Sequence, residues 1–176
     1  SGWFDKDGLR YYLDETTGRM STGWKLLSDK WYFFNQSGSM NTGWLSDNGA
    51  RYYLDSTGAM ATGWQELNGQ YYYLDPSSGQ MAVGWKDLNG KRYFLQESGV
   101  MATGWLDNNG SRYYLNNDGS MATGWHTDGS TKYYLAENGA VSTGWQLIDN
   151  SWYFFNQNGA MTTGWINPDG SWYYLG

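Results

Sequence analysis

The sequence has no cysteine and only one histidine among its 176 residues. Without cysteine there is no disulfide, no thiolate nucleophile and no cysteine-bound metal, so packing alone must hold the fold. The single histidine, His126, has no recurring serine and aspartate beside it from which a catalytic triad could form, and we expect it on the surface in a turn. No spacing resembles a calcium-binding loop. The sequence therefore indicates a protein that is not an enzyme and that has no metal site and no cofactor.

Positive charge and long apolar runs are also scarce. Lysine and arginine total 11 against 17 acidic residues, which gives a net charge of -6 and a pI near 4.5. Nucleic-acid binding needs clustered cations to neutralise phosphates, so DNA and RNA are excluded as partners. No segment reaches the roughly twenty apolar residues of a membrane-spanning helix, which argues against membrane insertion. If the protein is exported, its targeting signal lies outside this sequence.

The sequence is instead rich in aromatic residues, at 19%, and in glycine, with 25 residues. The dipeptide Gly-Trp occurs nine times at intervals of twenty or twenty-one residues. A short fixed period is typical of small units that stack on their own copies to bury an apolar face. The pattern thus predicts an all-β solenoid of tandem hairpins of about twenty residues, in one domain over 1–176 with eight full repeats and a truncated ninth.

Most repeats carry an Asn-Gly or Asp-Gly hairpin signal after Gly-Trp. In residues 104–123, Trp105 is followed by Asn109-Gly110 and then by the aromatic strand Arg112-Tyr113-Tyr114-Leu115. Asn-Gly tolerates positive φ at both central turn positions, so it favours a two-residue hairpin turn. The same prediction applies to Asp169-Gly170. Two period breaks, an extra Thr in Glu15–Gly18 and an extra Ser in Pro76–Gly79, should fall in the loops between hairpins.

Strand alternation separates two faces of the aromatic strand. Alternate side chains point to opposite sides, so Tyr52 and Leu54 share one face, which we interpret as the core, and Arg51 and Tyr53 share the other. The core pair recurs almost unchanged, whereas the first position of this strand varies between repeats. It is occupied by Arg10, Trp31, Arg51, Tyr71, Arg92, Arg112, Lys132, Trp152 and Trp172. Variation on a constant scaffold indicates a site that is present in some repeats only.

These motifs resemble the choline-binding repeat family of Gram-positive cell-surface proteins, whose consensus is Thr-Gly-Trp, a polar turn, Trp-Tyr-Tyr-Leu and then Gly-x-Met. The resemblance covers the whole chain and implies a left-handed solenoid. It implies a secreted protein at the bacterial cell surface or cell wall that binds choline or phosphocholine on teichoic or lipoteichoic acid. Family members anchor cell-wall hydrolases or other surface proteins in this way, and a homodimer through the last repeat stays open.

The resemblance also implies a site between consecutive repeats, formed by the Gly-Trp tryptophan and the hairpin tryptophan of one repeat with a tyrosine of the next. Aromatic faces suit the trimethylammonium of choline, which cannot donate a hydrogen bond. Carried over by position, the expected sets are Trp24, Trp31 and Tyr53; Trp145, Trp152 and Tyr174; Trp64, Tyr71 and Phe94; and the incomplete pair Trp165 and Trp172.

Five repeats have arginine or lysine where this pattern needs a ring. We expect such a cation to repel choline and to stack on the neighbouring tryptophan, so that the tryptophan serves packing. These repeats also resemble the glucan-binding repeats of glucosyltransferases and the receptor-binding repeats of clostridial toxins, which leaves a glucan or carbohydrate reader as the alternative function. A purely structural spacer is the third possibility.

Overall fold

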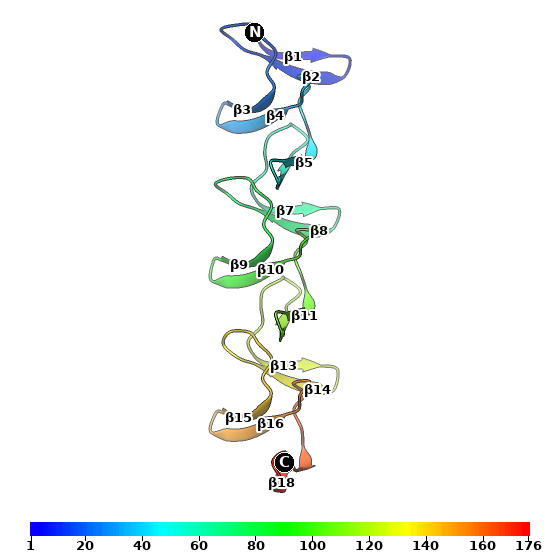
Figure 1. Cartoon of the computed structure of the whole chain (residues 1–176), viewed down its shortest axis with the longest axis vertical. Coiled ribbons are helices and arrows are strands. Elements are labelled where there is room, and N and C mark those ends of the chain that lie inside the picture. The colour runs from blue at the N-terminus through cyan, green and yellow to red at the C-terminus, as the bar shows by residue number, and fades with distance from the viewer. The chain divides into compact units, whose positions relative to one another are not determined.

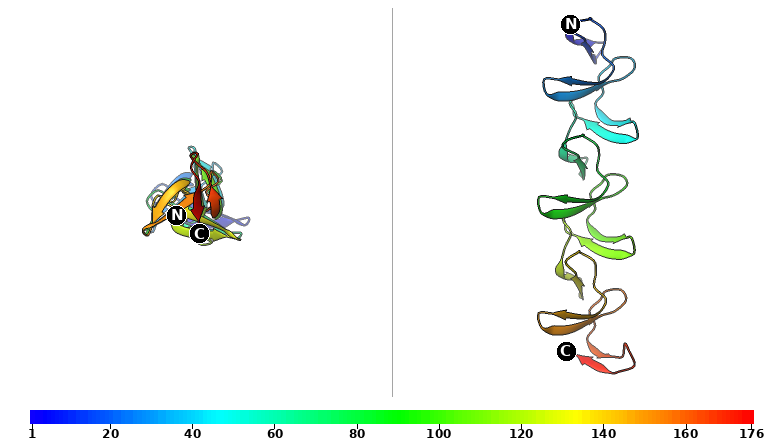
Figure 2. Two further views of the ribbon diagram at one scale, coloured as in Figure 1. Left: turned by 90° about the horizontal axis from the view of Figure 1, so that it is seen from below. Right: turned by 60° about the vertical axis from the view of Figure 1, so that its left-hand side comes forward.

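The computed structural model describes all residues 1–176 as eighteen β-strands without a helix. The strands pair two by two into nine antiparallel hairpins, one for each Gly-Trp dipeptide (Figure 1). Figure 2 shows the same succession of hairpins and loops from two other directions. No helix of the chain has the length and apolar character that crossing a bilayer requires. The predicted all-β series of tandem hairpins is confirmed.

The contacts divide the chain into two compact units. The first comprises Ser1–Gly84 with Leu95–Met101, and the second comprises Trp85–Phe94 with Ala102–Gly176. Hairpins one to four of the first unit are β1 (Gly2–Lys6) with β2 (Leu9–Leu13), β3 (Gly23–Leu27) with β4 (Lys30–Phe34), β5 (Gly43–Asp47) with β6 (Ala50–Leu54), and β7 (Gly63–Leu67) with β8 (Gln70–Leu74). The second unit contains most of hairpin five, which is β9 (Gly84–Leu88) with β10 (Lys91–Leu95), followed by hairpins six to nine, which are β11 (Gly104–Asn108) with β12 (Ser111–Leu115), β13 (Gly124–Asp128) with β14 (Thr131–Leu135), β15 (Gly144–Ile148) with β16 (Ser151–Phe155), and β17 (Gly164–Ile166) with β18 (Tyr173–Leu175).

The predicted two-residue turns are present where the sequence has Asn-Gly. Between β5 and β6, Asn48 has φ 49° and Gly49 has φ 79°, which is the positive-φ pair that such a turn requires. Hairpins two and eight make the same turn without glycine, and Asp29 reaches φ 62° and Asn150 reaches φ 63°. Asp and Asn tolerate this conformation better than other non-glycine residues.

The last hairpin departs from the prediction. Asp169-Gly170 was expected to form a tight turn, but β17 ends at Ile166 and β18 begins only at Tyr173, so residues 167–172 form a longer connection. Pro168 stands where the other first strands continue. Proline has no N–H to donate to the partner strand, and the pairing ends at Ile166, two residues before Pro168.

The core runs through the last residue of the second strand in hairpins two to eight, on the face that the alternation predicted. Its fully buried side chains are Phe34, Leu54, Leu74, Leu95, Leu115, Leu135 and Phe155. Leu54 pairs across its hairpin with Gly43, which has no side chain, and forms an isolated bridge with Met60 in the segment that follows. Leu54 therefore packs between the glycine opposite it and the connecting segment of its own repeat.

From the segment after hairpin two onwards, backbone hydrogen bonds join each connecting segment to the hairpin one repeat earlier, so that the segment after hairpin three bonds to hairpin two. The Met60 N–H donates to the Trp31 carbonyl at 2.8 Å, and the Met121 N–H donates to the Arg92 carbonyl at 2.7 Å. Glycine is favoured beside Met60, because Gly79 has φ 72° and a Cβ there would overlap the Met60 side chain. The links use main-chain atoms, so the side chain at the variable position does not affect them.

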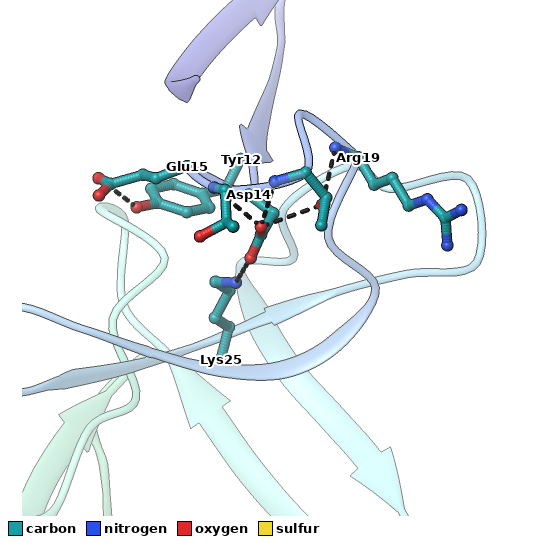
Figure 3. A network of polar contacts seen from close by, with 7 residues as sticks. Tyr12, Asp14, Glu15, Arg19 and Lys25 are labelled. Atoms are coloured by element: carbon teal, nitrogen blue, oxygen red, sulfur yellow. Dashed lines mark hydrogen bonds and ion pairs between the residues drawn. The ribbon is translucent and has the colours of Figure 1, made fainter.

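Aspartate or asparagine organises the loops between hairpins. Asp14 Oδ1 accepts hydrogen bonds from the Thr16 and Thr17 N–H groups, and Asp14 Oδ2 accepts one from Lys25 Nζ at 3.2 Å (Figure 3). Asp75 holds the second inserted loop in the same way through Ser77 and Ser78. Both period breaks therefore lie in loops, as predicted.

These bonds stabilise the ionised carboxylates. The Ser77 hydroxyl, with the N–H groups of Ser78 and Ser77, lowers the pKa of Asp75 to about 2, and the Thr17 N–H does the same for the pKa of Asp14. An unfolded aspartate has a pKa of about 3.9. The folded chain therefore binds fewer protons than the unfolded chain in this range, so the contribution is complete above about pH 4 and is lost as the pH falls towards 2.

We accordingly expect the melting temperature to fall between about pH 4 and pH 2. The Asp75→Asn variant keeps the Oδ1 acceptor, as Asn35 does in hairpin two, but cannot titrate. It should show a smaller loss of melting temperature over the same range. Differential scanning calorimetry from pH 7 to pH 2 measures this difference, and identical pH profiles for the two proteins would contradict the assignment.

Candidate functional site

The first site lies on one face of hairpin two. In the register of β3 and β4, Trp24 pairs with Phe33 and Leu26 pairs with Trp31, so these four side chains share a face. Trp24 and Trp31 line a pocket of about 350 Å³. Its other walls are Tyr52 from hairpin three, Met60 from the following segment, and Ser77 and Ser78 from the loop after hairpin four. Three successive repeats thus contribute to one pocket.

The third ring of this pocket is Tyr52. Its ring centroid lies 4.9 Å from that of Trp24 at an interplanar angle of 65°. Tyr53, the residue carried over from the family pattern, packs instead on Trp44 of its own hairpin at 5.2 Å, because the register places the two opposite each other. The strand face that we interpreted as core therefore contributes both to the core and to the pocket. Leu54 is buried in the core, whereas Tyr52 is half-buried and contacts Trp24 of the preceding hairpin.

The polar groups around the first pocket are engaged within the protein. Trp24 Nε1 donates to Asp47 Oδ2 at 3.0 Å, and Gln80 Nε2 donates to the Tyr52 hydroxyl at 3.4 Å. The hydroxyls of Ser77 and Ser78 both donate to Asp75 Oδ1. The pocket therefore offers mainly ring faces and the Met60 thioether to a ligand.

A second pocket of similar chemistry lies on hairpin eight. Trp145 and Trp152 meet edge to face, with centroids 6.3 Å apart at 87°, and Tyr173 of hairpin nine lies 5.0 Å from Trp145. The pocket measures about 490 Å³ and is also lined by Tyr174 and Leu175. Tyr174, the residue expected here, does reach this pocket, although its ring also packs on Trp165.

The remaining expected sets are arranged differently. Trp64 and Tyr71 share a face of hairpin four, where the Tyr71 hydroxyl donates to Glu66 at 3.1 Å. Phe94 belongs to the second unit and packs on Trp85 of its own hairpin at 5.1 Å. Trp165 and Trp172 are 68% and 67% exposed, and Trp172 lies in the irregular connection before β18. The strand pairing therefore does not bring these last two rings together.

Arginine at the variable position stacks on the tryptophan of its own hairpin, as predicted. The guanidinium carbon lies 4.7 Å from the Trp44 centroid for Arg51, 5.1 Å from Trp85 for Arg92 and 4.5 Å from Trp105 for Arg112. Three of the arginines at the variable position also face a carboxylate, which the sequence pattern did not predict. Asp5 lies 2.8 Å from Arg10, Asp87 lies 3.4 Å from Arg92, and Asp107 lies 3.7 Å from Arg112.

His126 is not the surface turn residue that was expected. It lies within β13, is half-buried, and stacks on Tyr114 with ring centroids 3.8 Å apart. Leucine occupies the equivalent place at Leu45 and Leu106. The position faces the preceding hairpin, which explains why a flat side chain is accommodated there. The turn of this hairpin begins only after Asp128.

Comparison with known proteins identifies the repeats. A sequence model described as the choline-binding repeat matches residues 21–57, 41–84, 82–117, 107–143 and 142–176. No curated protein sequence matches significantly. Among solved structures, choline binding protein F from Streptococcus pneumoniae, crystallised in the presence of a peptidoglycan analogue, is 37% identical with a TM-score of 0.84. The alignment covers 93% of this chain, which spans 58% of that protein.

Two further pneumococcal structures agree. The choline-binding domain of CbpL is 33% identical with a TM-score of 0.73, over 100% of this chain and 93% of that one. CbpJ is 32% identical with a TM-score of 0.77, over 98% and 84% of the two chains. The family so described is one of binding repeats, in agreement with the expectation of a non-catalytic chain. This chain belongs to the choline-binding repeat family.

Proposed function

We propose that the chain binds choline groups of teichoic or lipoteichoic acid through two aromatic cages. The first cage consists of Trp24, Trp31 and Tyr52, and the second of Trp145, Trp152 and Tyr173, with Tyr174 at its edge. The observation that carries the proposal is that rings from two consecutive hairpins converge on one pocket at both places. Tyr52 and Tyr173 thus replace Tyr53 and Tyr174 as the third rings.

The chemistry of the cages matches a quaternary ammonium. Trimethylammonium carries a permanent charge but no N–H, so it gains from ring quadrupoles and apolar contact and loses nothing where hydrogen-bond acceptors are absent. Met60 adds a polarizable wall to the first cage. A pocket of this size accommodates the choline head and leaves its substituent in solvent, as attachment to a polymer requires.

The chain would act as an anchor at the bacterial cell surface. Multiple cages on one chain raise the effective concentration at a polymer that presents many choline groups, so the combined attachment exceeds that of either cage. Such a module holds a surface protein or a cell-wall hydrolase on the wall; the modular autolysin LytC of Streptococcus pneumoniae, 26% identical with a TM-score of 0.60, is a relative of the second kind. Trp64 and Tyr71 remain a proposed third binding face on hairpin four; Phe94, which was expected to complete it, occupies the place of Tyr53 and packs on Trp85 of its own hairpin. Trp165 and Trp172 remain a proposed half-site, which a second copy in a homodimer would cover.

Choline should stabilise the folded chain by mass action. At a hundredfold excess over the dissociation constant, each independent cage adds about 2.7 kcal/mol. We expect the chain to be retained on a trimethylammonium resin and to be released by free choline but not by dextran or by sodium chloride of equal ionic strength. The salt control matters because the net charge of -6 alone causes retention on an anion exchanger. Release by salt alone, with a melting temperature indifferent to choline, would refute the proposal.

A further inference from the structure

The indole N–H of Trp24 is held by a carboxylate from the next hairpin. Trp24 Nε1 donates to Asp47 Oδ2 at 3.0 Å, and Asp47 is the last residue of β5. Because an indole N–H lies in the plane of its ring, the carboxylate stands at the edge of the ring and leaves the ring faces free. Asp47 is not among the residues that line the first pocket. Any effect of Asp47 on a ligand there is therefore exerted through Trp24 and not by direct contact.

The charge of Asp47 is not paired within the protein. Asp47 is half-buried, and no lysine or arginine forms an ion pair with it. The second hydrogen bond to Asp47 Oδ2 comes from the neutral amide of Asn48, at 3.2 Å. Salt screens a partly buried charge less than an exposed one. The first cage therefore has an unpaired negative charge directly behind one of its rings.

Hairpin six contains the same carboxylate and indole with a cation in place. Trp105 Nε1 donates to Asp128 Oδ2 at 2.9 Å, and the guanidinium carbon of Arg112 lies 4.5 Å from the Trp105 centroid. Carboxylate, indole and cation thus stand in series. A hydrogen bond to an anion polarises the indole, and a more negative ring face attracts a cation more strongly. In hairpin two no cation of the chain stacks on Trp24, so the equivalent place is open to a cation from outside.

The second cage lacks this carboxylate. Asp47 follows Trp24 by 23 residues. The residue at the same interval after Trp145 is Pro168, in the irregular connection after β17, and proline has no side-chain acceptor. Trp145 Nε1 accordingly donates no hydrogen bond within the protein. The two cages therefore have similar rings but differ in the charge behind them.

We propose that Asp47 is a positioning residue that makes the first cage the tighter of the two choline sites. This inference rests on the proposed choline-binding function. The carboxylate fixes the Trp24 ring and makes its face more negative, so a quaternary ammonium gains both from the polarised ring and from the charge behind it. The shape of the ligand determines its contact with the rings, whereas this further contribution depends on the charge of the ligand.

A charged and an uncharged ligand of the same shape separate these contributions. The probes are choline and the alcohol in which a tert-butyl group replaces the trimethylammonium group. Both are titrated into the full chain by isothermal calorimetry, and the first cage is identified as the site that Trp31→Ala removes. In the parent chain this site should be the tighter one for choline. Asp47→Asn keeps an oxygen acceptor but loses the charge, so it should weaken choline binding there about fivefold and leave the affinity for the alcohol unchanged.

Two further variants complete the test. Asp47→Leu removes the acceptor as well, so it should weaken both ligands at the first cage, choline by about tenfold or more. Asp128→Asn is the matched control, because Asp128 makes the same hydrogen bond in a hairpin where Arg112 covers the ring. It should leave both affinities unchanged. Melting temperatures report that each variant is folded.

The outcomes distinguish this inference from the proposed function. Unchanged choline affinity in Asp47→Asn, or an equal loss of affinity for choline and for the alcohol, would overturn the role of Asp47 while binding that depends on Trp31 upholds the cage. A weaker site at the first cage than at the second in the parent chain would overturn it as well. Absence of choline binding in the parent chain would refute the proposed function and this inference with it.

Discussion

The Trp31→Ala variant and the Trp152→Ala variant are each expected to bind one choline fewer than the parent chain. The variant that combines both substitutions should bind two fewer. Each ring forms a wall of its cage, and a desolvated cation–π contact contributes roughly 2 kcal/mol. Both tryptophans are exposed, at 43% and 61%, so the hairpins should remain folded without them. Isothermal titration with choline gives the stoichiometry, and circular dichroism in the aromatic region reports the fold.

Two controls accompany this experiment. Lys30→Ala changes the exposed neighbour of Trp31 on the other face of β4, so it should leave the number of bound cholines unchanged. Tyr52→Leu should weaken the first cage, whereas Tyr53→Leu should spare it and destabilise hairpin three, where Tyr53 packs on Trp44. Unchanged stoichiometry in the combined tryptophan variant would mean that choline binds elsewhere.

The Leu54→Ala variant is expected to lose about 2–5 kcal/mol of unfolding free energy, as core leucine truncations do. Leu54 is fully buried, and the glycine opposite it in the hairpin cannot relax into the cavity. Urea unfolding followed by tryptophan fluorescence measures the loss.

Leu26→Ala is the matched control for that experiment. Leu26 has the same side chain in the preceding hairpin but is 50% exposed, so its truncation should cost well under half as much. Similar losses for the two variants would show that the buried last residue of the second strand of each hairpin does not form the core.

The hairpins could be located from the sequence because their signals are local. Asn48-Gly49 determines a turn within four residues, and the alternation of Tyr52 and Leu54 determines a face within three. Stacking of Arg51 on Trp44 could be predicted for the same reason, since the two side chains share one face of a single hairpin.

The third ring of the cage could not be chosen from local signals. Tyr52 and Tyr53 are both tyrosines, and alternation separates their faces without saying which face meets the preceding hairpin. That choice follows from the cross-strand register, in which Tyr53 lies opposite Trp44 and is already in contact with it. The contribution of Ser77 and Ser78 comes from a loop two hairpins away, for which one repeat carries no signal.

The connections between repeats bear on how the chain folds. Among the side-chain hydrogen bonds of the first unit, those between residues farthest apart in the sequence are Trp24 with Asp47, 23 positions apart, and Gln80 with Tyr52, 28 positions apart. Contacts of such short sequence separation close small loops, and low contact order favours rapid folding in spite of the β-structure. Any adjacent pair of hairpins is a possible nucleus, and growth from it adds one repeat at a time. Hydrogen exchange should then show the protection of each hairpin falling with its distance from the most stable pair within its unit.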